Sequence, residues 1–258
     1  MLDLIDSHSH LDAVEFDADR NAVLRRARAA GVGGQIVPAV AFATFAVLRD
    51  LCAAETALYP AYGLHPMYLA AHKPEHLNEL TRWVAHEKPV AIGECGLDFF
   101  VPDLDAEVQR FFFRRQLDMA RDFNLPLILH ARRALDEVIA TIRHVGNLRG
   151  VVHSFSGSPE QAQQLWKCGF LIGLGGPLTY PRARRLREIA ATMPLEFLLL
   201  ETDSPDQPLH GHQGTRNEPA LLAQVCACVA ELRHTDPAEI AKATTANAKR
   251  LFALPVWA

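Results

Sequence analysis

The sequence predicts an α/β barrel, in which eight parallel strands close into a ring and helices cover its outside. Short apolar segments alternate with charged, amphipathic stretches along almost the whole chain, which is the pattern of parallel βα units. The length of 258 residues is close to the roughly 250 residues of such a barrel. Five strand-like segments also run directly into metal-ligand side chains, which would converge only if the strand ends share one mouth.

The elements follow one another in regular order. A strand at residues 2–5 precedes a helix at 17–30, which Gly31 terminates. Further strands are expected at 35–40, 58–62, 90–92, 125–129, 151–152, 170–172 and 197–200. Intervening helices are expected at 42–54, 105–123 and 159–168, among other periodic stretches, and a last helix at 236–252 should pack across the outside or bottom of the barrel.

Composition limits the classes of protein that this chain can belong to. With 49% hydrophobic residues and no linker, residues 1–258 are expected to form one domain. The net charge of −4 argues against broad affinity for nucleic acid, so DNA would bind weakly. Five scattered cysteines without a CxxC pair indicate neither a disulfide framework nor a zinc ribbon.

The same composition bears on location and partners. The chain starts without a basic segment, and no apolar run approaches the roughly 18 residues that a membrane span needs. By elimination we expect a cytoplasmic protein that does not bind membranes. No segment suggests a protein partner, and a monomer is expected.

The side chains at the strand ends predict a metal site. In an extended segment side chains alternate, so His8 and His10 point the same way. Glu94, His130, His153 and Asp203 each follow an apolar strand-like run. One histidine in such a place is usually a hydrogen-bonded core residue. Four histidines and two acids at the same level favour an ion, because buried charges and imidazoles need partners.

The motifs that contain these residues resemble a known family. The motif series of TatD-type metal-dependent deoxyribonucleases is similar to His8-Ser9-His10, Gly63-Leu64-His65-Pro66, Gly93-Glu94-Cys95-Gly96-Leu97-Asp98, Leu129-His130-Ala131-Arg132, His153-Ser154-Phe155-Ser156-Gly157 and Glu201-Thr202-Asp203-Ser204-Pro205. Residues 175–182 and 205–209 resemble the YjjV-like branch of that family. The resemblance implies a TIM (β/α)8 barrel of the amidohydrolase-like, metal-dependent hydrolase type.

The resemblance also implies two divalent ions per subunit, with Mg, Zn or Mn as the candidates. It assigns three ligands, His8, His10 and Asp203, to one ion, gives His130 and His153 to the other, and makes Glu94 the bridge. Glu94 and Asp203 are the catalytic candidates, and Asp203 would orient the attacking water and accept its proton. Many amidohydrolases use a carbamylated lysine as the bridge, but the nearest lysine, Lys88, precedes the strand.

Three further residues are predicted to contact substrate. His65 resembles the family residue that holds the non-bridging oxygens of a phosphodiester. Asp98, four residues after Glu94, would either contact substrate or orient a ligand. Arg132, two residues after His130, is placed to face the mouth.

The function that the resemblance implies is 3′-to-5′ exonuclease-type hydrolysis of DNA or another phosphodiester by metal-activated water. Because the same pair of ions can cleave an ester or amide, a D-aminoacyl-tRNA deacylase is an alternative. A nonenzymatic nucleic-acid or metal-binding protein on the same scaffold is a second alternative. The complete ligand set argues against it, since a decayed site would lack at least one ligand.

Overall fold

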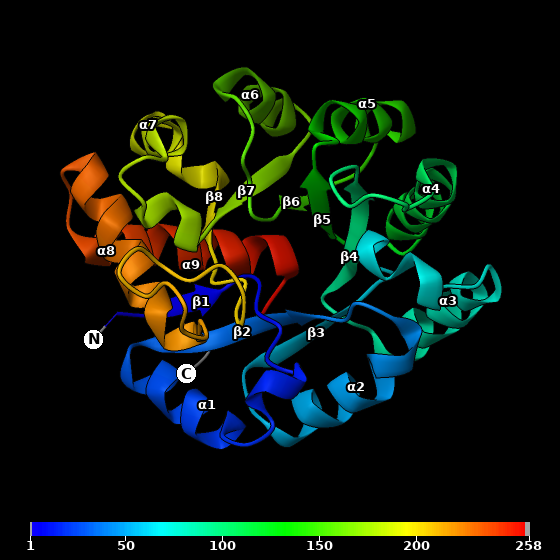
Figure 1. Ribbon diagram of the computed structural model, residues 1–258, viewed down its shortest axis with the longest axis horizontal. Helices are drawn as coiled ribbons and strands as arrows, with labels where there is room; N and C mark the ends of the chain where they lie inside the picture. The colour runs from blue at the N-terminus through cyan, green and yellow to red at the C-terminus, as the bar shows by residue number, and fades with distance from the viewer. Residues whose placement is uncertain (1, 256–258) are drawn as a thin grey trace.

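The computed structural model describes residues 2–255 and confirms the predicted barrel (Figure 1). Its single sheet has the order β1-β2-β3-β4-β5-β6-β7-β8, and neighbouring strands in this order pair in parallel. The strands are β1 (Leu4–Asp6), β2 (Val32–Pro38), β3 (Leu58–Tyr62), β4 (Ala91–Asp98), β5 (Leu127–Arg132), β6 (Gly150–Val152), β7 (Phe170–Leu174) and β8 (Leu198–Leu200). Each predicted strand is present, although β2 begins three residues earlier than expected, at Val32, and β4 extends to Asp98.

Helices follow the strands and, except for the last described one, form the outer ring (Figure 1). They are α1 (Arg20–Ala29), α2 (Phe45–Ala54), α3 (Glu75–Glu87), α4 (Ala106–Asp122), α5 (Leu135–Val145), α6 (Pro159–Lys167), α7 (Arg184–Thr192), α8 (Leu222–Arg233) and α9 (Pro237–Phe252). Short 3-10 turns are η1 (Val14–Phe16), η2 (Phe42–Thr44), η3 (Pro66–Ala71), η4 (Gly176–Thr179), η5 (Leu195–Phe197) and η6 (Pro219–Leu221). None of the described helices is both long and apolar enough to span a bilayer.

Local capping explains where several helices begin. Asp105 accepts hydrogen bonds from the backbone N–H groups of Glu107 and Val108 and so starts α4. Ser158 and Gln161 form a reciprocal capping box at the start of α6. The predicted helix at 42–54 is divided, because its first turn is the 3-10 turn η2 and regular α-helical bonding begins only at Phe45.

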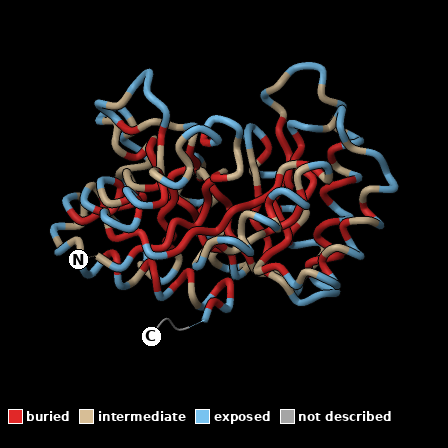
Figure 2. The backbone as a smooth tube through the Cα atoms, turned by 90° about the horizontal axis from the view of Figure 1, so that it is seen from below, coloured by how far each residue is buried: buried red, intermediate tan, exposed pale blue. Residues whose placement is uncertain are grey.

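The apolar core has two parts, which Figure 2 shows as buried segments at the centre of the molecule. One part lies between the sheet and the outer helices. The other fills the barrel, where every strand contributes one residue: Ile5, Ile36, Ala61, Ala91, Ile128, Val151, Leu171 and Leu199. Ala248, Leu251 and Phe252 of α9 join this inner cluster. As predicted, the last helix therefore closes the bottom of the barrel, which leaves the carboxyl ends of the strands as the open mouth.

The ends of the sheet are joined at the mouth. The backbone N–H and the hydroxyl of Ser7 both donate to the carbonyl of Leu200, each at 3.0 Å. The buried carboxylate of Asp6 accepts from the Thr202 N–H at 3.0 Å and from its hydroxyl at 2.6 Å. These contacts attach the segment after β1 to the segment after β8, and so bring their polar residues together.

An irregularity in β4 sets the direction of its functional side chain. Ala91 faces the barrel interior, so simple alternation would turn Glu94 away from it. The pairing of β4 with β5 shifts register between Ile92 and Cys95, and Glu94 is turned inward. Gly93 lies within this shift at φ +151°, and a β-carbon there would lie 2.7 Å from the carbonyl oxygen of Ile128. Only glycine fits this conformation and this close approach.

We therefore expect Gly93→Ala to lower the free energy of unfolding by about 2–4 kcal/mol, from backbone strain plus the clash with Ile128. The control is Gly146→Ala, because Gly146 also has a positive φ, of +66°, but has nothing within 4 Å of the added carbon. Gly146→Ala should lower the free energy of unfolding by only about 1 kcal/mol. Urea denaturation of both variants measures the difference, and equal losses would contradict a role for close packing at Gly93.

Candidate metal centre

All six predicted ligands lie together at the mouth of the barrel. His130 is in β5, Glu94 is in β4, and His153 follows β6 directly. His8 and His10 lie in the irregular segment after β1, and Asp203 lies in the loop after β8. Since His8 Nε2 and His10 Nε2 are 3.2 Å apart, the two rings converge as the alternation predicted.

One oxygen of Glu94 faces the first group of ligands. Glu94 Oε2 lies 3.1 Å from His8 Nε2 and 3.5 Å from His10 Nε2. The same two nitrogens lie 3.5 Å and 3.6 Å from Asp203 Oδ1. Two imidazole nitrogens and two carboxylate oxygens therefore surround one point.

The other oxygen of Glu94 faces a second group. Glu94 Oε1 is 2.7 Å from His153 Nε2, 3.1 Å from His130 Nδ1 and 2.8 Å from His65 Nε2. The two halves of one buried carboxylate thus serve two separate sets of imidazoles, as a bridging ligand would.

Asp98 lies directly behind His130. Its Oδ2 is 2.9 Å from His130 Nε2, and its Oδ1 accepts the backbone N–H groups of Phe100 and Val101. Because His130 Nε2 then carries the proton, Nδ1 presents a lone pair to the centre. The pKa of Asp98 falls to about 2, since the bond to His130 and these backbone bonds outweigh the effect of burial. The completely buried position of Asp98 favours orientation of His130 over direct contact with substrate.

His65 has the opposite protonation pattern. Its Nδ1 accepts a hydrogen bond from the backbone N–H of Met67 at 3.1 Å, and burial lowers its pKa to about 4. A neutral ring that accepts at Nδ1 carries its proton on Nε2. The Nε2–H of His65 therefore donates to Glu94, and His65 is placed as a hydrogen-bond donor beside the ligands.

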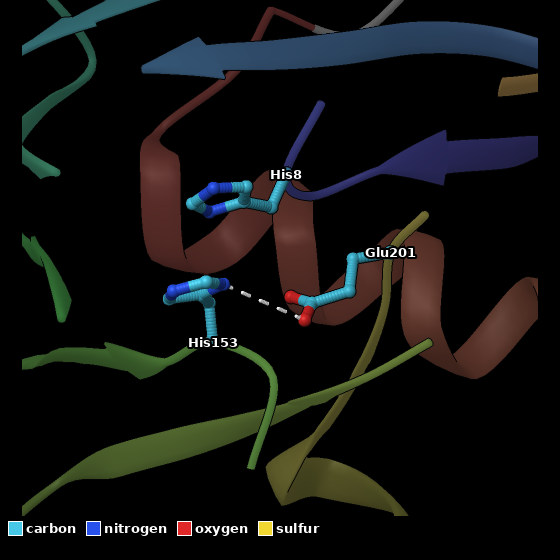
Figure 3. A group of neighbouring side chains, drawn as sticks. All are labelled: His8, His153 and Glu201. Carbon is cyan, nitrogen blue, oxygen red and sulfur yellow. Dashed lines mark ion pairs between the residues drawn. The ribbon is translucent and has the colours of Figure 1, made fainter. Parts of the chain in front are cut away.

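Glu201 is a buried acid that the sequence interpretation did not single out. Figure 3 shows it beside His153 and His8, whose rings stack with centroids 4.0 Å apart. Glu201 Oε1 accepts the Ser154 N–H at 2.5 Å and lies 3.9 Å from His153 Nδ1. Burial raises the pKa of Glu201 to about 8. Glu201 and Asp203 are two residues apart in the segment that follows β8, and the alternation applied to His8 and His10 would have paired them.

Room for Glu201 comes from β7. A β-carbon at Gly173 would lie 2.1 Å from Glu201 Oε2, so a side chain there would exclude the acid from the barrel. Oε2 has no hydrogen-bond partner. Glu201 thus supports the backbone after His153 and leaves one oxygen free inside the mouth.

A second group that sequence reasoning missed holds Asp203. Gln207 Nε2 donates to Asp203 Oδ2 and, at 2.8 Å, to Ser154 Oγ. Asn217 Nδ2 donates to the carbonyls of Thr202 and Asp206. The Gln207 amide thus links Asp203 to the loop after His153. The Asn217 amide holds the backbone of the loop that carries Asp203. Their positions depend on loop conformation, for which the sequence offers no periodic signal.

The charges of the side chains fit a bound cation. Burial alone would lower the pKa of His10 and His153, but the adjacent Glu94 and Asp203 raise them to about 9 and about 10. Glu94 Oε2 is buried and lies 3.1 Å from His8 Nε2, but the angles of this contact do not suit a hydrogen bond. This oxygen therefore has no hydrogen-bond partner. The acids therefore favour positive charge at this point, and a divalent ion such as Zn²⁺ or Mn²⁺ would supply that charge in place of the imidazole protons.

Other singled-out residues lie where expected. Arg132 is exposed at the end of β5, with its guanidinium carbon 3.7 Å from the centre of the Phe100 ring. Lys88 ends α3 and precedes β4, away from the ligands. Cys95 is fully buried, and burial raises the pKa of its thiol, so it is unsuited to act as a nucleophile. All five cysteines are free.

The fold agrees with comparisons to known proteins. The family model described as TatD related DNase matches residues 5–253. The chain belongs to the TatD family. It is 44% identical over 254 residues to the uncharacterized metal-dependent hydrolase YjjV of Escherichia coli K12, covering 97% of this chain and 98% of that protein. The uncharacterized metal-dependent hydrolase YabD of Bacillus subtilis is 36% identical, with coverage of 96% and 98%.

Structural comparison gives the same result. The crystal structure of the E. coli YjjV protein, a TatD homologue, superposes with a TM-score of 0.94 at 43% identity and covers 98% of both chains. This TatD-family protein is therefore a metal-dependent hydrolase with an amidohydrolase-like TIM barrel, and the predicted likeness to YjjV is confirmed.

The Asp98–His130 pair gives a test of ligand orientation. Asp98→Asn keeps an oxygen for the Phe100 and Val101 N–H groups but replaces the acceptor that fixes the His130 ring. We expect metal affinity to fall by about 10–100-fold. Competition with a fluorescent chelator measures it, and exposed Asp122→Asn is the control. Unchanged affinity in Asp98→Asn would contradict the orienting role.

Proposed function

We propose that this hydrolase is a dinuclear phosphodiesterase that removes nucleotides from DNA in the 3′-to-5′ direction. The observation that carries the proposal is the placement of Glu94, whose two oxygens face two distinct ligand groups. Such a pair suits in-line displacement at phosphorus, where attacking and leaving oxygens both need stabilisation. The family description as TatD related DNase supports DNA as the substrate.

The residues fit two divalent ions, with Mg, Zn and Mn as candidates. His8, His10 and Asp203 would hold one ion, His130 and His153 the other, and Glu94 both. When bound, such ions polarise the phosphoryl oxygens and lower the pKa of water towards neutrality. Asp98 keeps the Nδ1 lone pair of His130 directed inward.

Asp203 is the proposed proton acceptor for the attacking water. Its side chain is 12% exposed, the only carboxylate of the ligand set with more than marginal access to solvent at the mouth. Gln207 donates to its Oδ2, which fixes the plane of the carboxylate and leaves further lone pairs on the same group. A carboxylate held in this way accepts a proton without first reorienting.

His65 and Arg132 are proposed to hold the substrate phosphate. Without substrate the Nε2–H of His65 donates to Glu94, and we propose that it donates to a non-bridging oxygen of the phosphate once substrate is bound. A low pKa keeps His65 neutral, so the donor role is maintained at neutral pH. Stacking on Phe100 restrains the Arg132 guanidinium while leaving its N–H edge free for a phosphate.

The substrate class is tested by removing bound metal and restoring Mg, Mn or Zn singly. End-labelled single-stranded DNA, an abasic duplex, a D-aminoacyl-tRNA and a simple ester are then offered to each form. Stepwise shortening of DNA from its 3′ end supports the proposal. Release of the amino acid from the D-aminoacyl-tRNA without DNA cleavage would replace it with a deacylase, and metal binding without hydrolysis would indicate a nonenzymatic role.

Asp203→Asn should lower kcat by at least about two orders of magnitude at saturating metal, because it removes the proton acceptor while keeping side-chain shape. Steady-state kinetics on a short oligonucleotide, with metal content measured on the same samples, gives the test. The control is Asp206→Asn, an exposed acid in the same loop. If Asp203→Asn retained near wild-type kcat with metal bound, another group would have to be the base.

His65→Ala should retain full metal content and lose about 10²–10³-fold in kcat/KM on phosphodiesters, the usual cost of removing a donor to developing charge. The exposed histidine His86 provides the control His86→Ala. Elemental analysis and kinetics distinguish the outcomes. Loss of a metal ion from His65→Ala would make His65 a ligand and contradict the donor assignment.

A further inference from the structure

A cavity of about 550 Å³ opens among the segments that follow β5 and β6. Arg133, Ala134 and Leu135 line one side, and Ser156 and Gly157 line another. Arg185, at the start of α7, completes the wall and donates to the Ser156 carbonyl at 2.8 Å. None of these residues belongs to the metal centre described above.

Chain connectivity limits how far this cavity lies from the ligands. Arg133 is three residues beyond His130, and Ser156 is three residues beyond His153. At about 3.3 Å per extended residue, both walls lie within about 10 Å of the two ligands. A stacked nucleic-acid strand advances about 3.4 Å per nucleotide, so this reach corresponds to roughly one to three nucleotides.

The charge around the cavity favours an anion. Within residues 2–255, neither Arg133 nor Arg185 forms an ion pair with a carboxylate, although most arginines of α1 to α4 do. Of the two acids in the wall, Glu137 is paired with an arginine and Asp136 with a neutral amide, so Arg133 and Arg185 together outweigh the remaining negative charge. Glu137 is held by Arg110 at 2.5 and 3.0 Å, and Asp136 accepts from Gln161.

An exposed aromatic ring contacts the two arginines that follow His130 by two and three residues. Phe100 is 43% exposed, and the guanidinium carbons of Arg132 and Arg133 lie 3.7 and 4.6 Å from its ring centre. Cation–π contact restrains both guanidinium groups and leaves their N–H edges free. Aromatic rings interleaved with arginines are typical of surfaces that bind single strands, where bases stack and phosphates pair with cations.

We infer that this cavity is a second phosphate subsite, in which Arg133 and Arg185 bind a backbone phosphate of the same polynucleotide strand one to three nucleotides from the scissile bond. The inference rests on the proposed function and adds to it a preference for polynucleotides over single phosphodiesters. Contact with the Phe100 ring positions the guanidinium groups of Arg132 and Arg133 along this strand.

A second arginine–aromatic pair on the same face provides a matched control. Arg182 lies over the Tyr180 ring at 5.3 Å, beside a separate cavity that also includes His210. Arg182 carries the same charge as Arg133 and Arg185, but it lies outside the proposed subsite. A localised subsite therefore predicts that Arg133→Gln and Arg185→Gln differ from Arg182→Gln.

The experiment measures kcat/KM of the metal-loaded protein for a thymidine octanucleotide and for bis(p-nitrophenyl) phosphate, which has one phosphate. Fluorescence anisotropy of the labelled octanucleotide in EDTA adds a readout that needs no hydrolysis. Arg133→Gln and Arg185→Gln should each lower the ratio of octanucleotide to diester kcat/KM roughly tenfold and weaken octanucleotide binding by a similar factor. Each should also reduce the log–log salt slope by about one, while Arg182→Gln should leave both readouts within about twofold of wild type.

Two results would overturn the inference. The first is that Arg133→Gln and Arg185→Gln leave both the octanucleotide-to-diester ratio of kcat/KM and octanucleotide binding unchanged. The second is that Arg182→Gln has an equal effect, which would mean that the cavity acts only as part of a general basic surface. Failure of the proposed function would look different. If octanucleotide binding depended on Arg133 and Arg185 but no phosphodiester were cleaved, the subsite would be supported and the nuclease activity would be contradicted.

Discussion

The burial of Glu94 is the constraint on which the rest of this structure depends. A carboxylate removed from water is costly unless opposite charge or hydrogen bonds surround it. Here five imidazoles contact its two oxygens, and they come from β5 and from the segments after β1, β3 and β6. Only a closed ring of parallel strands brings segments so distant in sequence to one anion, so the architecture and the metal centre are coupled.

The two ends of the barrel interior differ in composition: the bottom is apolar and the top is polar. At the bottom, one apolar residue from each strand packs against α9 and forms a dry core. At the top, the same interior becomes polar, and its groups are held by partners such as Asp98, Gln207 and Asn217 rather than by apolar packing. Ser7 and Asp6 join the ends of the sheet at that level, which fixes the spacing between the ligands of β1 and β8.

Much of this arrangement could be predicted because it follows local periodicity. Ile128 and Val151 face the interior, and the ligands His130 and His153 follow each of them by two residues, as strand alternation requires. The apolar runs themselves marked all eight strands, and the residues after five of these runs marked the candidate ligands. Boundaries were less predictable at β2 and at the start of α2, where polar or small residues continue or interrupt an element without a change in hydrophobic pattern.

The sequence by itself determined the barrel and the set of residue types that suits divalent metal, because both depend on patterns within one segment. Only the tertiary structure decided that Glu94 faces inward, since the register shift of β4 against β5 reverses the alternation counted from Ala91. It alone also gave His130 its partner Asp98 and made room for Glu201 over Gly173. These contacts join segments that are distant in the chain, and their geometry depends on strand register and loop conformation, which local periodicity does not encode.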